Sequence, residues 1–173
     1  MLDVKIVKKA IKGNDKAFLM LMNQYKEQIY RTAFAYVKDE EMALDIVQEV
    51  SYKVYKSIES LREPKYFNTW IMKIAINIFT DFYNKKSKVV CMEQEELISK
   101  IDTTYEDKDE RIYLMECLDK LDDKYKKIIV LKYFDDLTFR EIAEILDIPE
   151  NTVKTHLYKG LSILRNNMNM EVI

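Results

Sequence analysis

Apolar residues in the last third of the chain recur every three or four positions, in two runs that a short break separates. The first run lies within residues 142–146 and the second within residues 153–164. The tripeptide Asp147-Ile148-Pro149 separates them, since proline ends one helix and suits the first turn of the next. Thr138, followed three residues later by Glu141, has the pattern of a capping box. The spacing therefore predicts a helix-turn-helix.

Polar residues of the second of these helices lie largely outside its apolar stripe. They are short polar, aromatic and basic side chains near the start of the helix: Asn151, Lys154, Thr155, His156, Tyr158 and Lys159. Such side chains are typical of a helix that reads the major groove of DNA. A helical hairpin whose polar face is only solvated would show the same spacing, so the segment alone leaves both interpretations open.

The N-terminal half shows the same periodicity. Apolar spacing predicts helices at residues 4–11, 15–36, 39–58 and 69–84. Asp15 is expected to cap the second helix, and the acidic run that begins at Asp39 suits the positive end of the third. In the fourth helix the expected core face is Trp70, Ile74 and Ile78.

The amino-acid composition indicates that the whole chain is all-α. The 173 residues include only two glycines and two prolines, which disfavours sandwiches, barrels and glycine-rich phosphate loops. The apolar periodicity is lost between residue 85 and about residue 109, where a basic run is followed by an acidic stretch. Two short helices, near 111–121 and 123–133, are then expected before the helix-turn-helix. We expect two small helical domains: an N-terminal helical bundle at 1–86, a flexible acidic linker at 87–109, and a helix-turn-helix domain at 110–173.

Candidate chemistry is sparse. The single histidine and the two isolated cysteines offer no ligand set for zinc and no catalytic triad, so we expect no cofactor and no metal. With no apolar run of about 18 residues, the chain is expected to be cytoplasmic. The net charge is −2, with an excess of basic residues at 50–88 and 151–173 on either side of a negative middle. Weak overall attraction to phosphate suggests that a partner holds the chain on DNA.

A second motif makes the pattern specific. The segment DIVQEVSYKVYKSI (Asp45–Ile58), a loop, NTWIMKIAINIFTDFYNKK, a linker and a C-terminal helix-turn-helix follow one another over nearly the whole chain. This order and spacing resembles the extracytoplasmic-function (ECF) group of sigma-70-type RNA polymerase sigma factors. The resemblance implies an initiation factor without catalytic activity that binds core RNA polymerase and promoter DNA. It implies no small-molecule substrate and no membrane insertion, and an anti-sigma factor as a further partner.

The resemblance also implies residue roles. Asp45, Gln48 and Glu49 would dock on core polymerase. The loop at 60–68 would capture a base of the −10 element, and the residues implied in binding that element are Lys53, Ser57, Leu61, Lys73, Asn77, Lys85 and Lys86. The six polar residues of the last helix would contact the −35 element in duplex form. Lysine replaces arginine at several of these positions, and an ammonium gives a point charge rather than a bidentate fork.

Two other functions remain as alternatives. A stand-alone helix-turn-helix transcriptional regulator would bind its promoter without polymerase, which a gel shift of the isolated chain tests. An enzyme that used Asp45 and Glu49 would need further histidine or carboxylate ligands nearby, and the sequence shows none.

Overall fold

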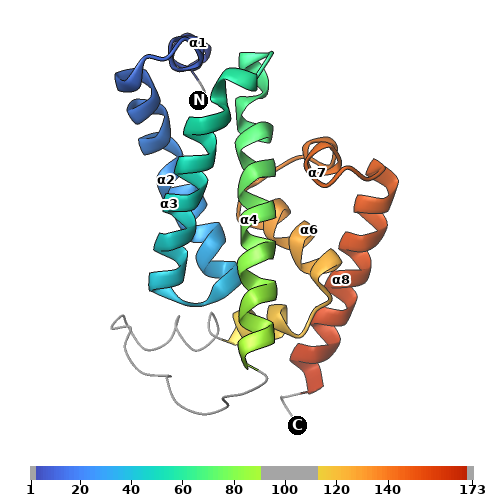
Figure 1. Cartoon of the computed structure of the whole chain (residues 1–173). Coiled ribbons are helices and arrows are strands. Elements are labelled where there is room, and N and C mark those ends of the chain that lie inside the picture. Colours follow the sequence, from blue (N-terminus) through green and yellow to red (C-terminus); the bar gives the residue numbers. More distant parts are fainter. Residues whose placement is uncertain (1–2, 91–112, 171–173) are drawn as a thin grey trace.

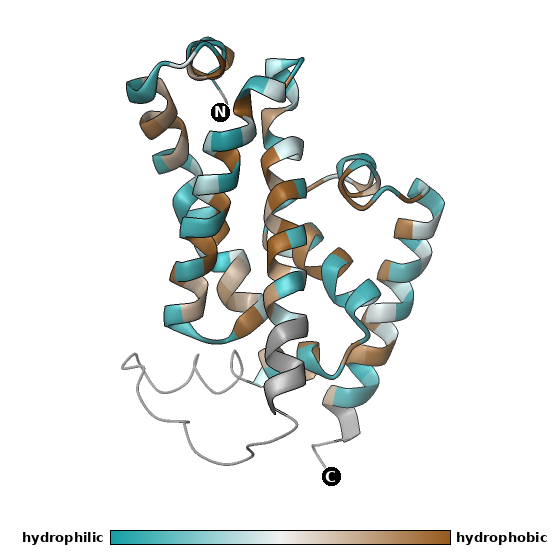
Figure 2. Cartoon of the chain, in the orientation of Figure 1, coloured by the Kyte–Doolittle hydropathy of each residue, from teal (hydrophilic) through white to brown (hydrophobic). Residues whose placement is uncertain are grey.

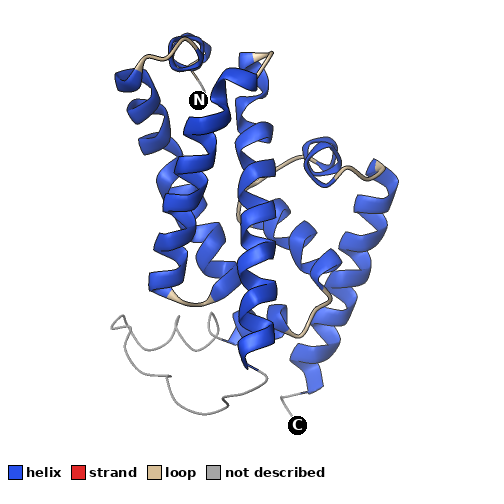
Figure 3. Ribbon diagram, viewed as in Figure 1, coloured by secondary structure: helices blue, strands red, loops and turns tan. Residues whose placement is uncertain are grey.

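The computed structural model describes residues 3–90 and 113–170, and every regular element in those ranges is a helix (Figure 3). The side chains of residues 84–90 and 169–170 lie outside the description. The elements are α1 (Val4–Ile11), α2 (Asp15–Val37), α3 (Glu40–Ser57), the 3-10 turns η1 (Ile58–Ser60) and η2 (Pro64–Tyr66), α4 (Phe67–Val90), a short helix at 113–119, α6 (Asp123–Tyr133), α7 (Phe139–Leu146) and α8 (Glu150–Met170). The predicted all-α class is confirmed.

Short polar side chains fix where the first helices begin. Asp3, Asn14 and Asp39 each stand before a helix and accept a hydrogen bond from a backbone N–H of its first turn, at 2.8 to 2.9 Å. The expected cap at Asp15 is wrong by one position, because Asn14 accepts from Ala17 and Asp15 is already helical. These caps satisfy N–H groups that the helix cannot pair by itself.

The N-terminal half is a bundle in which α2, α3 and α4 run side by side and α1 crosses one end (Figure 1). The apolar faces of these helices turn inward and the polar faces outward (Figure 2). The apolar residues that recur at helical spacing along α3 and into η1 are buried: Ala43, Ile46, Val47, Val50, Val54 and Ile58.

The core face predicted for α4 is partly wrong. Ile78 is buried, but Trp70 and Ile74 are only half-buried and pack at the edge of the core. The buried positions of α4 form a broader face that the three predicted residues border, namely Phe67, Ile71, Met72, Ala75, Ile76, Ile78 and Phe79. A helix with neighbours on two sides needs a wider apolar face than a single stripe provides.

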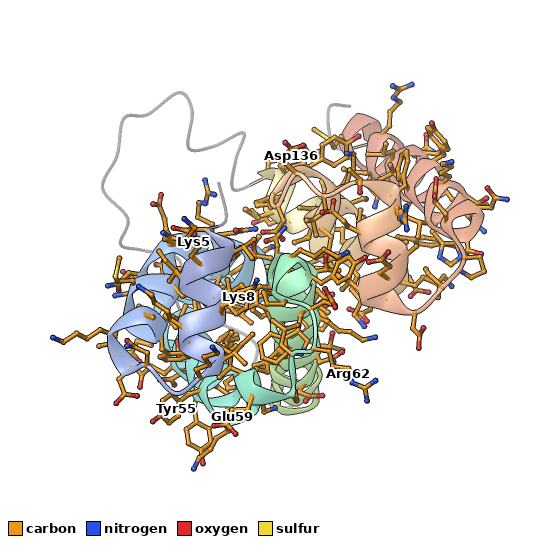
Figure 4. All side chains as sticks on the ribbon, turned by 90° about the horizontal axis from the view of Figure 1, so that it is seen from above. Lys5, Lys8, Tyr55, Glu59, Arg62 and Asp136 are labelled. Atoms are coloured by element: carbon orange, nitrogen blue, oxygen red, sulfur yellow. The ribbon has the colours of Figure 1, made fainter. Side chains whose placement is uncertain are left out.

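The C-terminal half consists of the helix at 113–119, α6, α7 and α8, with α6 and α7 both against α8. It also packs on the N-terminal half, because α7 contacts α4 and α6 contacts α2 (Figure 1). Seen from above in Figure 4, the two halves lie next to each other. Their buried apolar residues form one continuous cluster.

Helix α4 runs to Val90, past the predicted end at Asn84 and past the predicted boundary at residue 86. The residues after Asn84 contain no glycine or proline that would end a helix, and lysines suit a helix C-terminus. The rest of the predicted linker, from residue 91 to 109, lies outside the described residues.

Candidate nucleic-acid interface

An acidic face runs along the outside of α3. Asp45 and Gln48 are exposed, and the Glu49 side chain is 43% exposed, so three residues at helical spacing share one solvent-facing side. Two apolar neighbours of this face are also exposed, although the sequence did not indicate them as part of a site. Leu44 is 43% exposed and Tyr52 is 59% exposed, and both lie one turn from Gln48. In the sequence, the only sign of their exposure is that both residues lie outside the apolar stripe of α3.

The end of α3 leads into the loop at 60–68, which is expected from the resemblance to capture a base of the −10 element. Lys53 is exposed and lies 3.8 Å from the Glu49 carboxylate, while the Ser57 hydroxyl donates to the backbone carbonyl of Lys53 at 2.6 Å. Leu61, in contrast, is only 8% exposed and belongs to the core. Its buried side chain is not available to stack on a base in this conformation.

An exposed aromatic ring does exist in this loop. Tyr66 is 48% exposed, and the Lys65 ammonium lies 4.8 Å from the centre of its ring. Exposed Glu59 and Arg62 belong to the same segment, on the N-terminal half (Figure 4). An exposed ring beside a cation is suited to stacking on an unpaired base and neutralising its phosphate. The sequence signal for Tyr66 was an aromatic residue in the loop at 60–68, directly before an apolar helix.

On α4, Lys73 and Asn77 lie one turn apart and are both exposed. The amide of Asn77 can donate and accept hydrogen bonds to a base edge, and Lys73 can neutralise a phosphate. Lys85 and Lys86 lie near the end of α4, and their side chains are outside the described residues.

The helix-turn-helix forms as the sequence predicts. The backbone N–H of Thr138 donates to the Glu141 carboxylate at 2.8 Å, and the backbone N–H of Glu141 donates to the Thr138 hydroxyl at 3.3 Å. Helix α7 ends at Leu146, the φ of the following residue, Asp147, is 57° and lies in the left-handed region, and α8 begins at Glu150. This turn sets the direction in which α8 leaves α7.

Helix α8 crosses α6 closely at Gly160, which is buried. A Cβ atom at this position would lie 3.0 Å from both the Cδ1 atom of Ile129 and the Cβ atom of Tyr125. The glycine therefore permits α8 to pack closely against α6.

Five of the six residues predicted to contact the −35 element are exposed or partly exposed on α8. Asn151, Thr155 and Tyr158 form one exposed line along α8, with Tyr158 67% exposed. Lys159 is also exposed, and the Lys154 ammonium pairs with Glu150 at 2.7 Å with its side chain 41% exposed. This face combines hydrogen-bonding groups, an aromatic ring and two cations on one helix.

His156 lies apart from that line. Its ring packs edge-on against Tyr125 of α6, with 5.4 Å between the ring centres, and its Nδ1 atom is buried. The histidine therefore has a packing contact in this structure, and its predicted contact with a base stays a prediction.

Within the described ranges, no group of three or more His, Cys, Asp or Glu side chains is placed to hold a metal ion. No helix described in the structure is both long and apolar enough to cross a membrane. Cys117 is buried as a free thiol, and Cys91 is among the residues that are not described.

Two family models match the chain, one in each half. Sigma-70 region 2 matches residues 21–89, and Sigma-70, region 4 matches residues 111–164. Among curated proteins, the RNA polymerase sigma factor SigV of Bacillus subtilis (strain 168) is 41% identical over 92% of this chain and 96% of its own length. The ECF RNA polymerase sigma factor SigW of the same organism is 33% identical over 97% of each chain.

A solved structure shares the fold. The sigma factor RpoE of Bartonella quintana, in complex with the anti-sigma factor NepR, matches with a TM-score of 0.74 at 17% identity. The match covers 89% of this chain and 98% of that one, so both halves are included.

Proposed function

The chain belongs to the extracytoplasmic-function group of sigma-70-type RNA polymerase sigma factors, and on this premise we propose which surfaces carry out promoter recognition. One observation carries the proposal. An exposed acidic face on α3 and an exposed polar and basic face on α8 lie in the segments that match regions 2 and 4. We assign the first face to core RNA polymerase, the end of α3 with α4 to the −10 element, and α8 to the −35 element.

Core polymerase docks on Asp45, Gln48 and Glu49 in this proposal, with Leu44 and Tyr52 as apolar neighbours. Interfaces combine an apolar centre with a charged rim, and exposed tyrosine is enriched in them. The acidic face would meet a basic surface, and its exposure means that no rearrangement of α3 is needed before docking.

Charge reversal tests the docking face. Asp45→Arg combined with Glu49→Arg should abolish co-purification with core polymerase, because two like charges would then face the basic partner. The double variant Glu27→Arg, Asp81→Arg changes the net charge by the same amount at two exposed positions elsewhere and serves as the control. Unchanged co-purification of the first variant, with its helical circular dichroism intact, would contradict the assignment.

At the −10 element, Asn77 reads a base edge and Tyr66 stacks on an unpaired base in this proposal, while Lys53 and Lys73 neutralise phosphates. Unstacking a base costs a few kcal/mol, and stacking on an aromatic side chain returns about 1–3 kcal/mol. Melting would thus be driven by binding energy, and the chain would perform no chemical step itself.

At the −35 element, the exposed line from Asn151 to Tyr158 enters the major groove in this proposal. Lys154 and Lys159 flank that line, where they can reach phosphates or guanine. The net charge of −2 gives little long-range attraction to DNA, which fits a protein that polymerase delivers to the promoter.

We also propose an anti-sigma factor as a regulatory partner and the cytosol as the place of action. The partner proposal is supported by the RpoE structure, in which a chain of the same fold is bound to the anti-sigma factor NepR.

A further inference from the structure

Helix α1 carries a row of lysines along one side, which we call the lysine face. Its members are all exposed, and at about 100° per residue they fall within an arc of about 100° of the helix surface: Lys5, Lys8, Lys9 and Lys12. The buried residues of α1, Val7 and Ala10, lie on the opposite side and pack into the core. Helix α1 precedes residues 21–89, which match Sigma-70 region 2, so that match gives it no role.

Helix stability alone does not account for the lysine face. Cations suit the C-terminal end of a helix, which explains the positions of Lys8, Lys9 and Lys12. Lys5, however, lies in the first turn, where a positive charge is unfavourable. Like charges three and four residues apart also repel one another on a helix surface. The helix would therefore be relieved by an anion bound along this side.

Other helices of the chain balance their exposed cations differently. Lys53 has Glu49 four residues before it at 3.8 Å, and Lys154 has Glu150 at 2.7 Å. Helix α1 contains no acidic residue, and none of its four lysines forms an ion pair with any residue that the structure describes. Within the described ranges, the lysine face is thus a set of cations without a counter-charge.

The lysine face lies next to the loop that we assign to the −10 element. Helix α1 contacts both η1 and η2, and in Figure 1 it lies at the same end of the bundle as the loop between α3 and α4. Figure 4 looks onto this end and labels Lys5 and Lys8 on α1, and Glu59 and Arg62 on the segment between α3 and α4. The exposed ring of Tyr66 belongs to the same segment.

This end of the molecule has a local excess of positive charge. Residues 3–16 and 59–66 together carry seven basic and four acidic residues, although the whole chain has a net charge of −2. A cationic surface could attract either a nucleic acid or an anionic membrane. Insertion at a membrane surface needs an apolar helix face, and that face of α1 is buried in the core. The position and the charge therefore favour a nucleic acid.

The length of the lysine face suits a short stretch of one strand. Lys5 and Lys12 are seven residues apart, which is about 10 Å at a rise of about 1.5 Å per residue. Phosphates of one strand follow one another at about 3.4 Å along a duplex and further apart in an extended strand, so the face can meet about two to three of them.

We propose that the lysine face of α1 is a further nucleic-acid contact, which binds phosphates of the unpaired strand beside the base captured by the loop at 60–68. The contact is electrostatic and reads no base. It holds the strand against the loop while the base is out of the stack, so it adds binding energy that only melted DNA receives. This inference rests on the proposed role of that loop at the −10 element.

Two DNA probes, taken from a promoter that the holoenzyme transcribes in vitro, test the contact. The first is a duplex that contains the −35 element and ends before the −10 element. The second carries, in addition, the −10 element and the nucleotides after it as a single strand. Holoenzyme is assembled from core polymerase and the full chain, and fluorescence anisotropy gives its affinity for each probe as a function of salt concentration.

The test variant replaces the whole lysine face by glutamine: Lys5→Gln, Lys8→Gln, Lys9→Gln and Lys12→Gln. The control is the double variant Lys26→Glu, Arg31→Glu, which lowers the net charge by the same amount at two exposed positions further along α2. Circular dichroism verifies that both variants keep their helices.

We expect the test variant to bind the single-stranded probe at least about tenfold more weakly than the wild type at about 0.1 M salt. Its salt slope should fall by about 1.4 to 2, since each phosphate of a single strand contributes about 0.7. Its affinity for the duplex probe, and both affinities of the control, should stay at the wild-type level. An unchanged affinity and slope on the single-stranded probe would overturn the proposal, and so would an equal loss on both probes.

Tyr66→Ala, measured on the same probes, separates this contact from the proposed function of the loop. If the test variant loses affinity for the single-stranded probe and Tyr66→Ala does not, the stacking role of the loop is rejected and the lysine contact stands. If only Tyr66→Ala loses affinity, the lysine contact alone is rejected.

Discussion

Replacing Gly160 by alanine sets two effects of known size against each other. Alanine in a helix interior is favoured over glycine by about 1 kcal/mol. The new methyl group, however, would lie 3.0 Å from Ile129 Cδ1 and from Tyr125 Cβ, whereas carbon atoms normally approach to about 3.5–4.0 Å. Ile129 can move its terminal methyl group, but the Cβ atom of Tyr125 moves only with the backbone of α6.

Helices α6 and α8 must therefore separate by several tenths of an ångström, and overpacking of this kind costs about 1–3 kcal/mol. We expect Gly160→Ala to lower the free energy of unfolding by about 1 kcal/mol, which corresponds to a fall in Tm of about 3 °C for a chain of this size. Urea and thermal unfolding, followed by circular dichroism, measure both quantities.

Ser162→Ala is the matched control, since Ser162 is an exposed residue of the same helix. It should raise stability by up to about 0.5 kcal/mol through helix propensity alone. If Gly160→Ala were as stable as the wild type or more stable, the close approach of α8 to α6 would not constrain this position and the reasoning would be refuted.

Four further predictions concern Asp135, the capping box and the DNA contacts. Burial raises the pKa of Asp135 to about 6, so the folded chain binds more protons than the unfolded chain between this value and the ordinary pKa of 3.8; lowering the pH from 7 to 5 should therefore raise the free energy of unfolding by roughly 1 kcal/mol relative to Asp135→Asn, as measured by urea unfolding. Thr138→Ala should lower the free energy of unfolding by about 1 kcal/mol through loss of the capping box, with Thr155→Ala as the exposed comparison. Lys154→Ala should weaken −35 binding; an equal loss on all sequences, with the salt slope reduced by about 1, would indicate a phosphate contact rather than base readout. Asn77→Ala should impair promoter opening more than −35 binding, and an unaltered permanganate footprint at the −10 region would reject that role.

The helices could be predicted from the sequence because their signals are local. Thr138 and Glu141 form their capping box within one turn, and the apolar spacing of α3 matches its buried residues. The prediction of the core face of α4 was wrong at Trp70 and Ile74, because the residues that pack against this helix lie far away in the sequence.

For the candidate site, exposure on a helix could be predicted from the sequence, whereas burial by residues far away in the sequence could not. Asp45 is exposed as expected, since a solvent-facing position follows from the helical period. The burial of Leu61 and the packing of His156 against Tyr125 could not be predicted, because the neighbours of both residues lie far away in the sequence. No local pattern identifies Lys126 as buried, because a lysine is normally solvated and only the opposite half of the chain encloses it.

The continuous apolar core that spans both halves has a thermal consequence. Separating the two halves would bring apolar surface between α4 and α7 into contact with water, and such a separation carries a positive heat-capacity change. Apolar attraction weakens on cooling, so the free energy that holds the two halves together falls as the temperature is lowered. The contact between the halves is therefore expected to be more stable in a warm cell than in a cold one.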